Sequence, residues 1–124
     1  MQLYVPLNSP HTHDHTSEFA HAVARVLEKH RPDDVTSVMA KAQRPGKVFI
    51  DWSPNSRHKT TVAAYSLRAK PHPTVSTPVT WDEVSDCADG QPLSFTAPEV
   101  LARVADLGDL FAPCATQVQH LPPT

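Results

Sequence analysis

The chain has 124 residues, and its 11 lysines and arginines nearly balance its 13 aspartates and glutamates, giving a formal net charge of −2 at pH 7. This length allows one domain or part of one, and the balanced charge argues against a stand-alone nucleic-acid-binding domain, because such domains are usually strongly basic. The sequence has no apolar run near the ~18 residues that span a membrane and no signal-peptide pattern, so we expect a cytoplasmic protein without a membrane partner. The two cysteines, Cys87 and Cys114, lie far apart and predict reduced thiols rather than disulfides.

The first forty residues predict a strand, a polar loop and a helix. Thirteen prolines against three glycines indicate a chain of short elements. Residues 3–5 are typical of a short strand. Apolar side chains recur at helical spacing over residues 17–30, with Thr16 or Ser17 as the candidate cap. Residues 34–42 are ambiguous between a short helix and a turn.

The remaining elements complete an α+β fold. The apolar run at 48–52 predicts a strand buried on both faces, and residues 60–66 predict a second strand that pairs with it as an antiparallel hairpin. Two short helices are predicted at 81–84 and 99–107. We therefore expect a mostly antiparallel sheet, which also includes residues 3–5, with flanking helices.

The most informative residue is Asp51, which ends the apolar strand between Arg44 and Arg68. Metal-assisted phosphate chemistry needs carboxylates that bind divalent cations and arginines that neutralise phosphates. A lone aspartate near arginines is also common as a strand cap that pairs with one of them. The local pattern by itself favours this structural interpretation.

Four longer segments follow one another in the sequence: QLYVPL, VTSVMAKAQRPGKVFIDWSPN, TTVAAYSLRAK and PTVSTPVTWDEV. In these segments the chain resembles the C-terminal part of the polymerase domain of bacterial ligase D, a DNA repair enzyme of non-homologous end joining in the archaeo-eukaryotic primase superfamily. The resemblance covers residues 1–112, is closest over 1–84, and leaves 113–124 as a flexible tail. It implies the C-terminal portion of a primase-polymerase catalytic domain.

The resemblance also implies roles for individual residues. Asp51 corresponds to the third catalytic carboxylate of the family, which binds Mn²⁺ or Mg²⁺. Arg44 and Arg68 correspond to arginines that reach the nucleoside triphosphate, and Asn55 lies in the loop near the incoming nucleotide. Gln2 stands where many relatives have a histidine, so it can hydrogen-bond a phosphate or sugar but carries no charge.

The predicted hairpin tip contains a small basic patch. A solvated turn is the default interpretation for Arg57 and Lys59. In the family context this tip could approach template or primer phosphates of a DNA end.

The first two metal carboxylates of the family form an Asp-x-Asp pair, and this sequence contains no such pair. The resemblance therefore implies a truncated nucleotidyltransferase that is inactive by itself. Two alternatives remain open. The chain could be one subunit of a split polymerase whose upstream half-domain or ligase module docks at the edge of residues 3–5. It could also be a non-catalytic remnant that binds nucleotides or DNA.

A histidine-rich segment, His11-Thr-His13-Asp14-His15, offers imidazole ligands that suit zinc or nickel. It matches no zinc-site spacing and has no cysteine, which favours adventitious metal capture over a specific site. Both tryptophans, Trp52 and Trp81, are predicted to pack in a core rather than to stack on bases.

Overall fold

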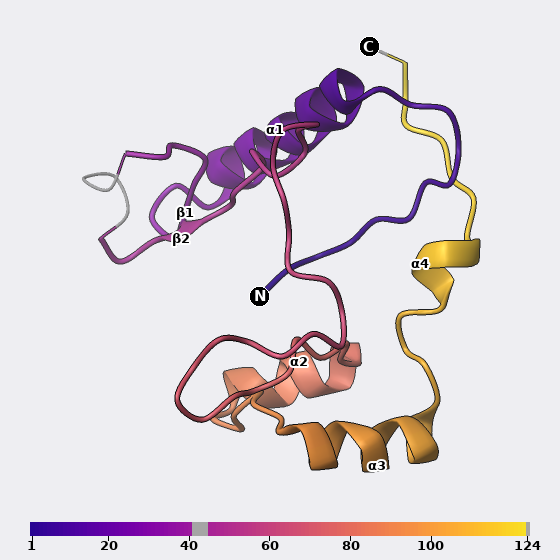
Figure 1. Cartoon of the computed structure of the whole chain (residues 1–124). Coiled ribbons are helices and arrows are strands. Elements are labelled where there is room, and N and C mark those ends of the chain that lie inside the picture. Colours follow the sequence, from indigo (N-terminus) through magenta and orange to yellow (C-terminus); the bar gives the residue numbers. More distant parts are fainter. Residues whose placement is uncertain (41–44, 124) are drawn as a thin grey trace. The chain divides into compact units, whose positions relative to one another are not determined.

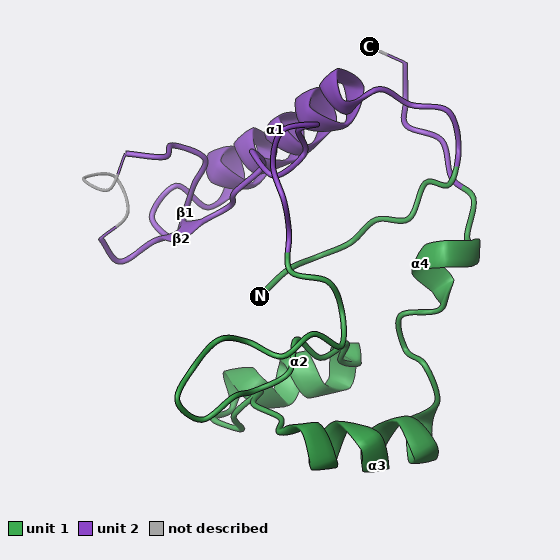
Figure 2. Ribbon diagram, viewed as in Figure 1, with its two compact units in different colours: residues 1–8, 62–118 green, residues 9–61, 119–124 purple. Residues whose placement is uncertain are grey.

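The computed structural model describes residues 1–40 and 45–123 of the chain. Two compact units make up the chain (Figure 2): unit 1 contains residues 1–8 and 62–118, and unit 2 contains residues 9–61 and 119–124. The elements of the described residues, in chain order (Figure 1), are α1 (His13–His30), β1 (Val35–Thr36), β2 (Val48–Phe49), α2 (Trp81–Ala88), α3 (Ala97–Leu107) and α4 (Pro113–Thr116).

Helix α1 of unit 2 begins four residues earlier than predicted. Its N-cap is Thr12, whose side-chain oxygen accepts a hydrogen bond from the backbone N–H of His15 at 3.1 Å. The expected caps, Thr16 and Ser17, both lie inside the helix instead, and the hydroxyl of Thr16 donates to the carbonyl of His13. The helix ends at residue 30, as predicted, and the backbone N–H of Arg31 closes the last turn.

The sheet of unit 2 is parallel, so the expectation of a mostly antiparallel sheet is wrong for the described residues. Strands β1 and β2 pair in parallel, with Val35 opposite Val48 and Thr36 opposite Phe49. The ambiguous segment 34–42 therefore contains a strand. Val48 is 65% exposed, so the predicted burial of this strand on both faces is also wrong.

The other two predicted strands do not form. Residues 3–5 and 60–66 contain no strand, and one isolated antiparallel bridge joins Leu67 to Val75. One physical reason lies at Tyr65, whose φ of 68° is a left-handed conformation that interrupts an extended strand. The overall α+β class is nevertheless confirmed, because helices and a small sheet coexist in the chain.

Unit 1 is built around α2 and α3. Each helix has a threonine as its N-cap residue and a glutamate three residues after that threonine. Thr80 and Glu83 form a reciprocal capping box, and the carboxylate of Glu99 accepts the N–H of Thr96 at 3.1 Å. An ion pair between Arg103 of α3 and Glu83 joins the helices, with Nη1 donating to Oε2 at 2.6 Å. This bond holds the pKa of Glu83 at about 2, well below its usual range.

Both units have small cores. The buried apolar residues of the described chain are Ala24 in unit 2 and Val75 and Val100 in unit 1. Many large apolar side chains stay in solvent, including Trp81 at 73% exposed, so its predicted packing role is wrong. None of the described helices is long and apolar enough to cross a membrane.

Candidate functional site

Asp51 lies two residues after β2, at the start of a loop in unit 2. Its side chain is exposed, and its Oδ1 atom accepts two hydrogen bonds from Ser53: one from the backbone N–H at 3.0 Å and one from the hydroxyl at 2.6 Å. The Oδ2 atom accepts no hydrogen bond from any residue that the structure describes. One carboxylate oxygen is therefore held by Ser53, and the other has no hydrogen-bond donor among the described residues.

The loop is attached to the rest of unit 2 through Trp52. Its ring stacks on His21 of α1, with ring centroids 4.0 Å apart and an interplanar angle of 13°. The indole Nε1 donates to the carbonyl of Ser37 at 3.3 Å. Trp52 therefore packs against α1, but it is half-buried and is not one of the buried core residues, so the predicted core role is only partly met. This packing restrains the backbone next to Asp51.

Helix α1 also holds Ser37, whose carbonyl accepts the hydrogen bond from the Trp52 indole. The carboxylate of Glu28 accepts the backbone N–H of Ser37 at 2.7 Å and its hydroxyl at 3.2 Å. The backbone hydrogen bond is the main cause of a lowered pKa at Glu28. Sequence reasoning missed Glu28 and His21, since both belong to an ordinary amphipathic helix and only the folded chain brings them to the loop.

Three other predicted site residues belong to the same loop. The Nδ2 of Asn55 donates to the carbonyl of Trp52 at 3.0 Å and helps to close the turn. The Nζ of Lys59 donates to the hydroxyl of Ser53 at 3.0 Å, and the side chain of Arg57 is exposed. Of these three residues, Lys59 is linked to Asp51 through the hydroxyl of Ser53, whereas Asn55 bonds the backbone of Trp52.

The remaining predicted residues lie elsewhere. Arg44 is outside the described residues, while Gln2 and Arg68 belong to unit 1. The hydroxyl of Tyr4 donates to Oε1 of Gln2 at 2.6 Å, and the Tyr4 ring meets Phe111 edge-on with centroids 5.3 Å apart. Arg68 is exposed, and its backbone N–H donates to the carbonyl of Thr74 at 2.9 Å.

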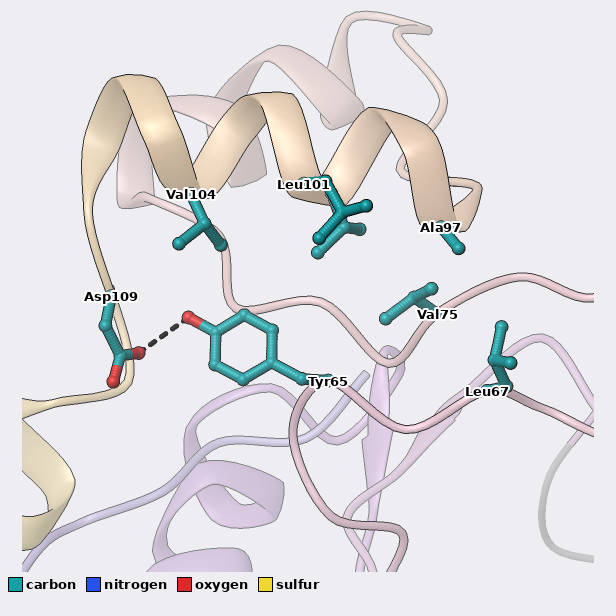
Figure 3. Close-up of a pocket in the computed structure, with 8 residues that line it drawn as sticks. Tyr65, Leu67, Val75, Ala97, Leu101, Val104 and Asp109 are labelled. Carbon is teal, nitrogen blue, oxygen red and sulfur yellow. Dashed lines mark hydrogen bonds between the residues drawn. The ribbon is translucent and has the colours of Figure 1, made fainter.

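Unit 1 also contains an open apolar groove of about 540 Å³ (Figure 3). Its lining residues are Tyr65, Leu67, Val75, Ala97, Val100, Leu101, Val104 and Asp109. The Tyr65 hydroxyl donates to Asp109 at 2.6 Å, and this bond lowers the pKa of the Asp109 carboxyl. The pKa of Tyr65 is raised, mainly because the side chain is partly buried. The groove contains none of the predicted site residues.

The ligand set for a divalent cation is incomplete in the described part of the chain. No group of three or more histidine, cysteine, aspartate or glutamate side chains there could hold a metal ion. In the histidine segment the Nδ1 atoms of His11 and His15 lie 3.2 Å apart and face each other as a pair. At the loop, the exposed carboxylate of Asp51 has oxygen atoms of the kind that Mg²⁺ and Mn²⁺ prefer, so its chemistry would suit one corner of such a site.

The fold matches that of a solved polymerase domain. The polymerase domain from Mycobacterium tuberculosis ligase D in complex with DNA is similar with a TM-score of 0.83 and 44% sequence identity. The match covers 92% of this chain and 39% of that chain. The α+β architecture is therefore that of part of a ligase D polymerase domain.

The family follows from sequence comparison. The profile described as LigD, primase-polymerase domain matches residues 1–111, so the chain belongs to this family. The multifunctional non-homologous end joining protein LigD of Mycolicibacterium smegmatis is 49% identical over 113 residues, which are 91% of this chain and 14% of that protein. The LigD of Pseudomonas aeruginosa is 40% identical over 84 residues, which are 68% of this chain and 10% of that protein. The chain spans a small part of the length of these relatives.

Proposed function

We propose that this chain forms part of the nucleotide-addition site of a polymerase that acts at DNA ends during bacterial end joining, a process of the cytoplasm. The observation that carries the proposal is the carboxylate of Asp51, which is exposed just after β2 with its Oδ2 atom open among the described residues. In this proposal Asp51 is one ligand of Mn²⁺ or Mg²⁺. The bound cation would polarise phosphate oxygens of the nucleotide.

Four further residues are assigned nucleotide contacts from the family resemblance, each considered within its own unit. Arg68 has an exposed guanidinium, which suits bidentate contacts to phosphate oxygens. Gln2 has its carbonyl oxygen occupied by Tyr4, so its amide N–H groups are the part left to donate to a phosphate or sugar. We assign the same triphosphate role to Arg44 and a nucleotide contact to Asn55.

Arg57 and Lys59 are proposed to contact DNA phosphates. Both are exposed on the loop that begins at Asp51, and cationic side chains of this kind position a nucleic-acid backbone without reading its sequence. A solved relative of 44% identity is a polymerase domain in complex with DNA, which supports a DNA partner. Binding through such contacts should weaken steeply with salt.

We further propose that the chain adds no nucleotides by itself. A two-metal site needs several carboxylates to fix both ions, and the sequence contains no Asp-x-Asp pair beside Asp51. One carboxylate would support metal-dependent nucleotide binding but would not align the attacking and leaving oxygens.

Two measurements test this function. Isothermal titration of Mn²⁺ and ATP should show binding that Asp51→Ala and Arg68→Ala each weaken at least tenfold, while Lys70→Ala, an exposed cation in unit 1, leaves it unchanged. A primer-extension assay with Mn²⁺ and ribonucleotides should give no product. Strong extension by the pure chain, abolished by Asp51→Ala, would contradict the proposed inactivity.

A split polymerase is the second candidate, and the exposed apolar side chains favour it. Leu3 is 73% exposed, Val5 is 56% exposed, and Leu101 in the groove is 74% exposed. Exposed apolar side chains of this kind would suit a binding face if a partner covered them. A separately expressed segment of the M. tuberculosis relative that carries an Asp-x-Asp pair should then co-purify with this chain and restore extension. A non-catalytic nucleotide- or DNA-binding module would instead bind without any gain of activity.

A further inference from the structure

We propose that Ser53 and Lys59 are positioning residues for Asp51. In this inference, which rests on the proposed function, they hold Oδ1 of the carboxylate so that Oδ2 faces the site where the divalent cation would bind. The evidence is a continuous chain of hydrogen bonds within one loop. Lys59 Nζ donates to Ser53 Oγ at 3.0 Å, and Ser53 Oγ donates to Asp51 Oδ1 at 2.6 Å.

The direction of these hydrogen bonds is fixed by chemistry. An ammonium group has three donors and no acceptor, so Lys59 must donate to the Ser53 oxygen. A carboxylate is an acceptor only, so the single hydroxyl hydrogen of Ser53 must point to Asp51. Lys59 therefore favours the one hydroxyl orientation that serves the carboxylate, because its positive charge repels the hydroxyl hydrogen.

The backbone adds a second restraint on the same oxygen. The N–H of Ser53 donates to Asp51 Oδ1 at 3.0 Å, so two donors from one residue converge on this atom. Two convergent donors restrict rotation of a short carboxylate far more than one does. The stack of Trp52 on His21 fixes the intervening backbone, so the side-chain and backbone restraints act together.

A carboxylate held through one oxygen presents the other in a fixed direction. Groups that orient a metal ligand without touching the metal commonly change metal affinity about 10- to 100-fold when removed. The loop here is exposed, and contacts in water are weaker than buried ones. We therefore expect effects at the low end of this range or below it.

For both substitutions, simple electrostatics predicts tighter metal binding, whereas a positioning role predicts weaker binding. This difference makes the inference testable. Removing the positive charge of Lys59 lowers the repulsion felt by a nearby cation, so a purely Coulombic effect would tighten metal binding. Removing the hydroxyl of Ser53 leaves more charge on the carboxylate and would also tighten binding. A positioning role predicts weaker binding in both variants.

The probe is Tb³⁺, an oxygen-seeking ion whose luminescence is excited by a nearby indole, in a Trp81→Phe background where Trp52 is the sole tryptophan. Asp51→Asn should abolish the signal. Ser53→Ala should weaken Tb³⁺ affinity about three- to tenfold and Lys59→Met about two- to threefold, whereas Ser53→Thr, which keeps the hydroxyl, should remain within about twofold.

The matched controls are Ser56→Ala, which removes a hydroxyl that accepts the N–H of His58 in the same loop, and Lys70→Met, which removes an exposed charge from unit 1. Neither should change the affinity. Circular dichroism should be unchanged in every variant, which separates positioning from loss of the fold. Mn²⁺ competition should rank the variants in the same order.

The outcomes separate the two proposals. If Asp51→Asn leaves the signal unchanged, or no signal appears, the metal-binding role proposed for Asp51 fails. If the signal depends on Asp51 but Ser53→Ala and Lys59→Met bind equally well or more tightly, the positioning inference alone is overturned. NMR couplings that report the Asp51 side-chain torsion test it without metal: one rotamer in the parent chain and averaging in Ser53→Ala support it, and averaging in the parent chain overturns it.

Discussion

Unit 1 joins its two longer helices through an ion pair, whereas unit 2 attaches a loop to one helix through a ring stack and backbone hydrogen bonds. In unit 1 the partners are Arg103 and Glu83, and both side chains are mostly buried, at 13% and 27% exposed. In unit 2 the stack of Trp52 on His21 provides the attachment, and Asp51 beside it remains exposed.

The difference suggests that the contact most important for stability and the carboxylate proposed to bind a metal lie in different units. A partly buried ion pair is expensive to break, because removing one partner leaves an uncompensated charge. Hydrogen bonds in an exposed loop contribute less to folding, but in the proposed function they orient the carboxylate of Asp51 for a ligand. The proposed metal ligand, Asp51, therefore lies in unit 2, whereas the partly buried ion pair lies in unit 1.

The largest expected effect on stability comes from the substitution Arg103→Leu. This change leaves Glu83 without its cationic partner and should lower the free energy of unfolding of unit 1 by about 2–3 kcal/mol. Urea denaturation followed through amide NMR signals of each unit measures it. The matched change Arg57→Leu, on an exposed arginine of unit 2, should have little effect, and equal losses in both units would contradict the contrast between them.

Acid should weaken unit 1 through the same carboxylate. The folded pKa of Glu83 lies at about 2 against an ordinary 4.5. A depressed carboxyl pKa gives stability that is present above the unfolded value and is lost as the pH falls through the folded value, here from about 4.5 to about 2. The difference corresponds to about 3 kcal/mol at most, and partial exposure reduces it to about 2 kcal/mol.

This prediction is checked by comparing unfolding at pH 6 and pH 3 in the parent chain and in Glu83→Gln. The glutamine cannot titrate, so its variant should lose less stability on acidification than the parent chain. The same pH dependence in both proteins would show that other groups dominate the acid response of unit 1.

Removing a helix cap should destabilise one unit at a time. Thr12→Ala removes the acceptor for the N–H of His15 in α1, and Thr80→Ala removes the capping box of α2. Each should cost about 1 kcal/mol, the first in unit 2 and the second in unit 1. Amide hydrogen exchange should show increased exchange confined to the unit that carries the change, and exchange spread over both units would indicate a single cooperative fold.

The smallest expected effect is that of His21→Ala. Loss of the ring stack should destabilise unit 2 by about 0.5–1 kcal/mol and change the emission of Trp52, measured in a Trp81→Phe background. His30→Ala, at the exposed end of the same helix, is the control. An unchanged Trp52 spectrum would argue that the stack does not restrain the loop.

Much of the helical structure was predictable from local sequence. The ends of the helices are set by side chains within one turn, as with Thr80 and Glu83, so short-range chemistry is sufficient to locate them. The cap of α1 shows the limit of this reasoning, because Thr12 and Thr16 are both acceptable caps and the chain uses the first.

Strand pairing could not be predicted in the same way. The N–H groups of Val48 and Ile50 donate to the carbonyls of Asp34 and Thr36, at 2.7 and 3.0 Å, rather than to the nearer segment at 60–66. A strand pattern states which residues are extended but not which edge they meet. The exposure of Trp81 was unpredictable for the same reason, since a large apolar ring gives no information about what will cover it.

For the candidate site, the sequence by itself determined the family and the place of Asp51 in an apolar segment with cations nearby, because these depend on residue identity and order. The predicted strand at 48–52 is shorter in the structure, where β2 ends at Phe49 and Asp51 lies in the loop that follows. Only the tertiary structure decided that Ser53 and Lys59 form a chain of hydrogen bonds to that carboxylate. It also decided that α1 holds Trp52 beside it. The physical reason is that such contacts depend on loop torsions and on residues far apart in the chain, which local sequence patterns do not encode.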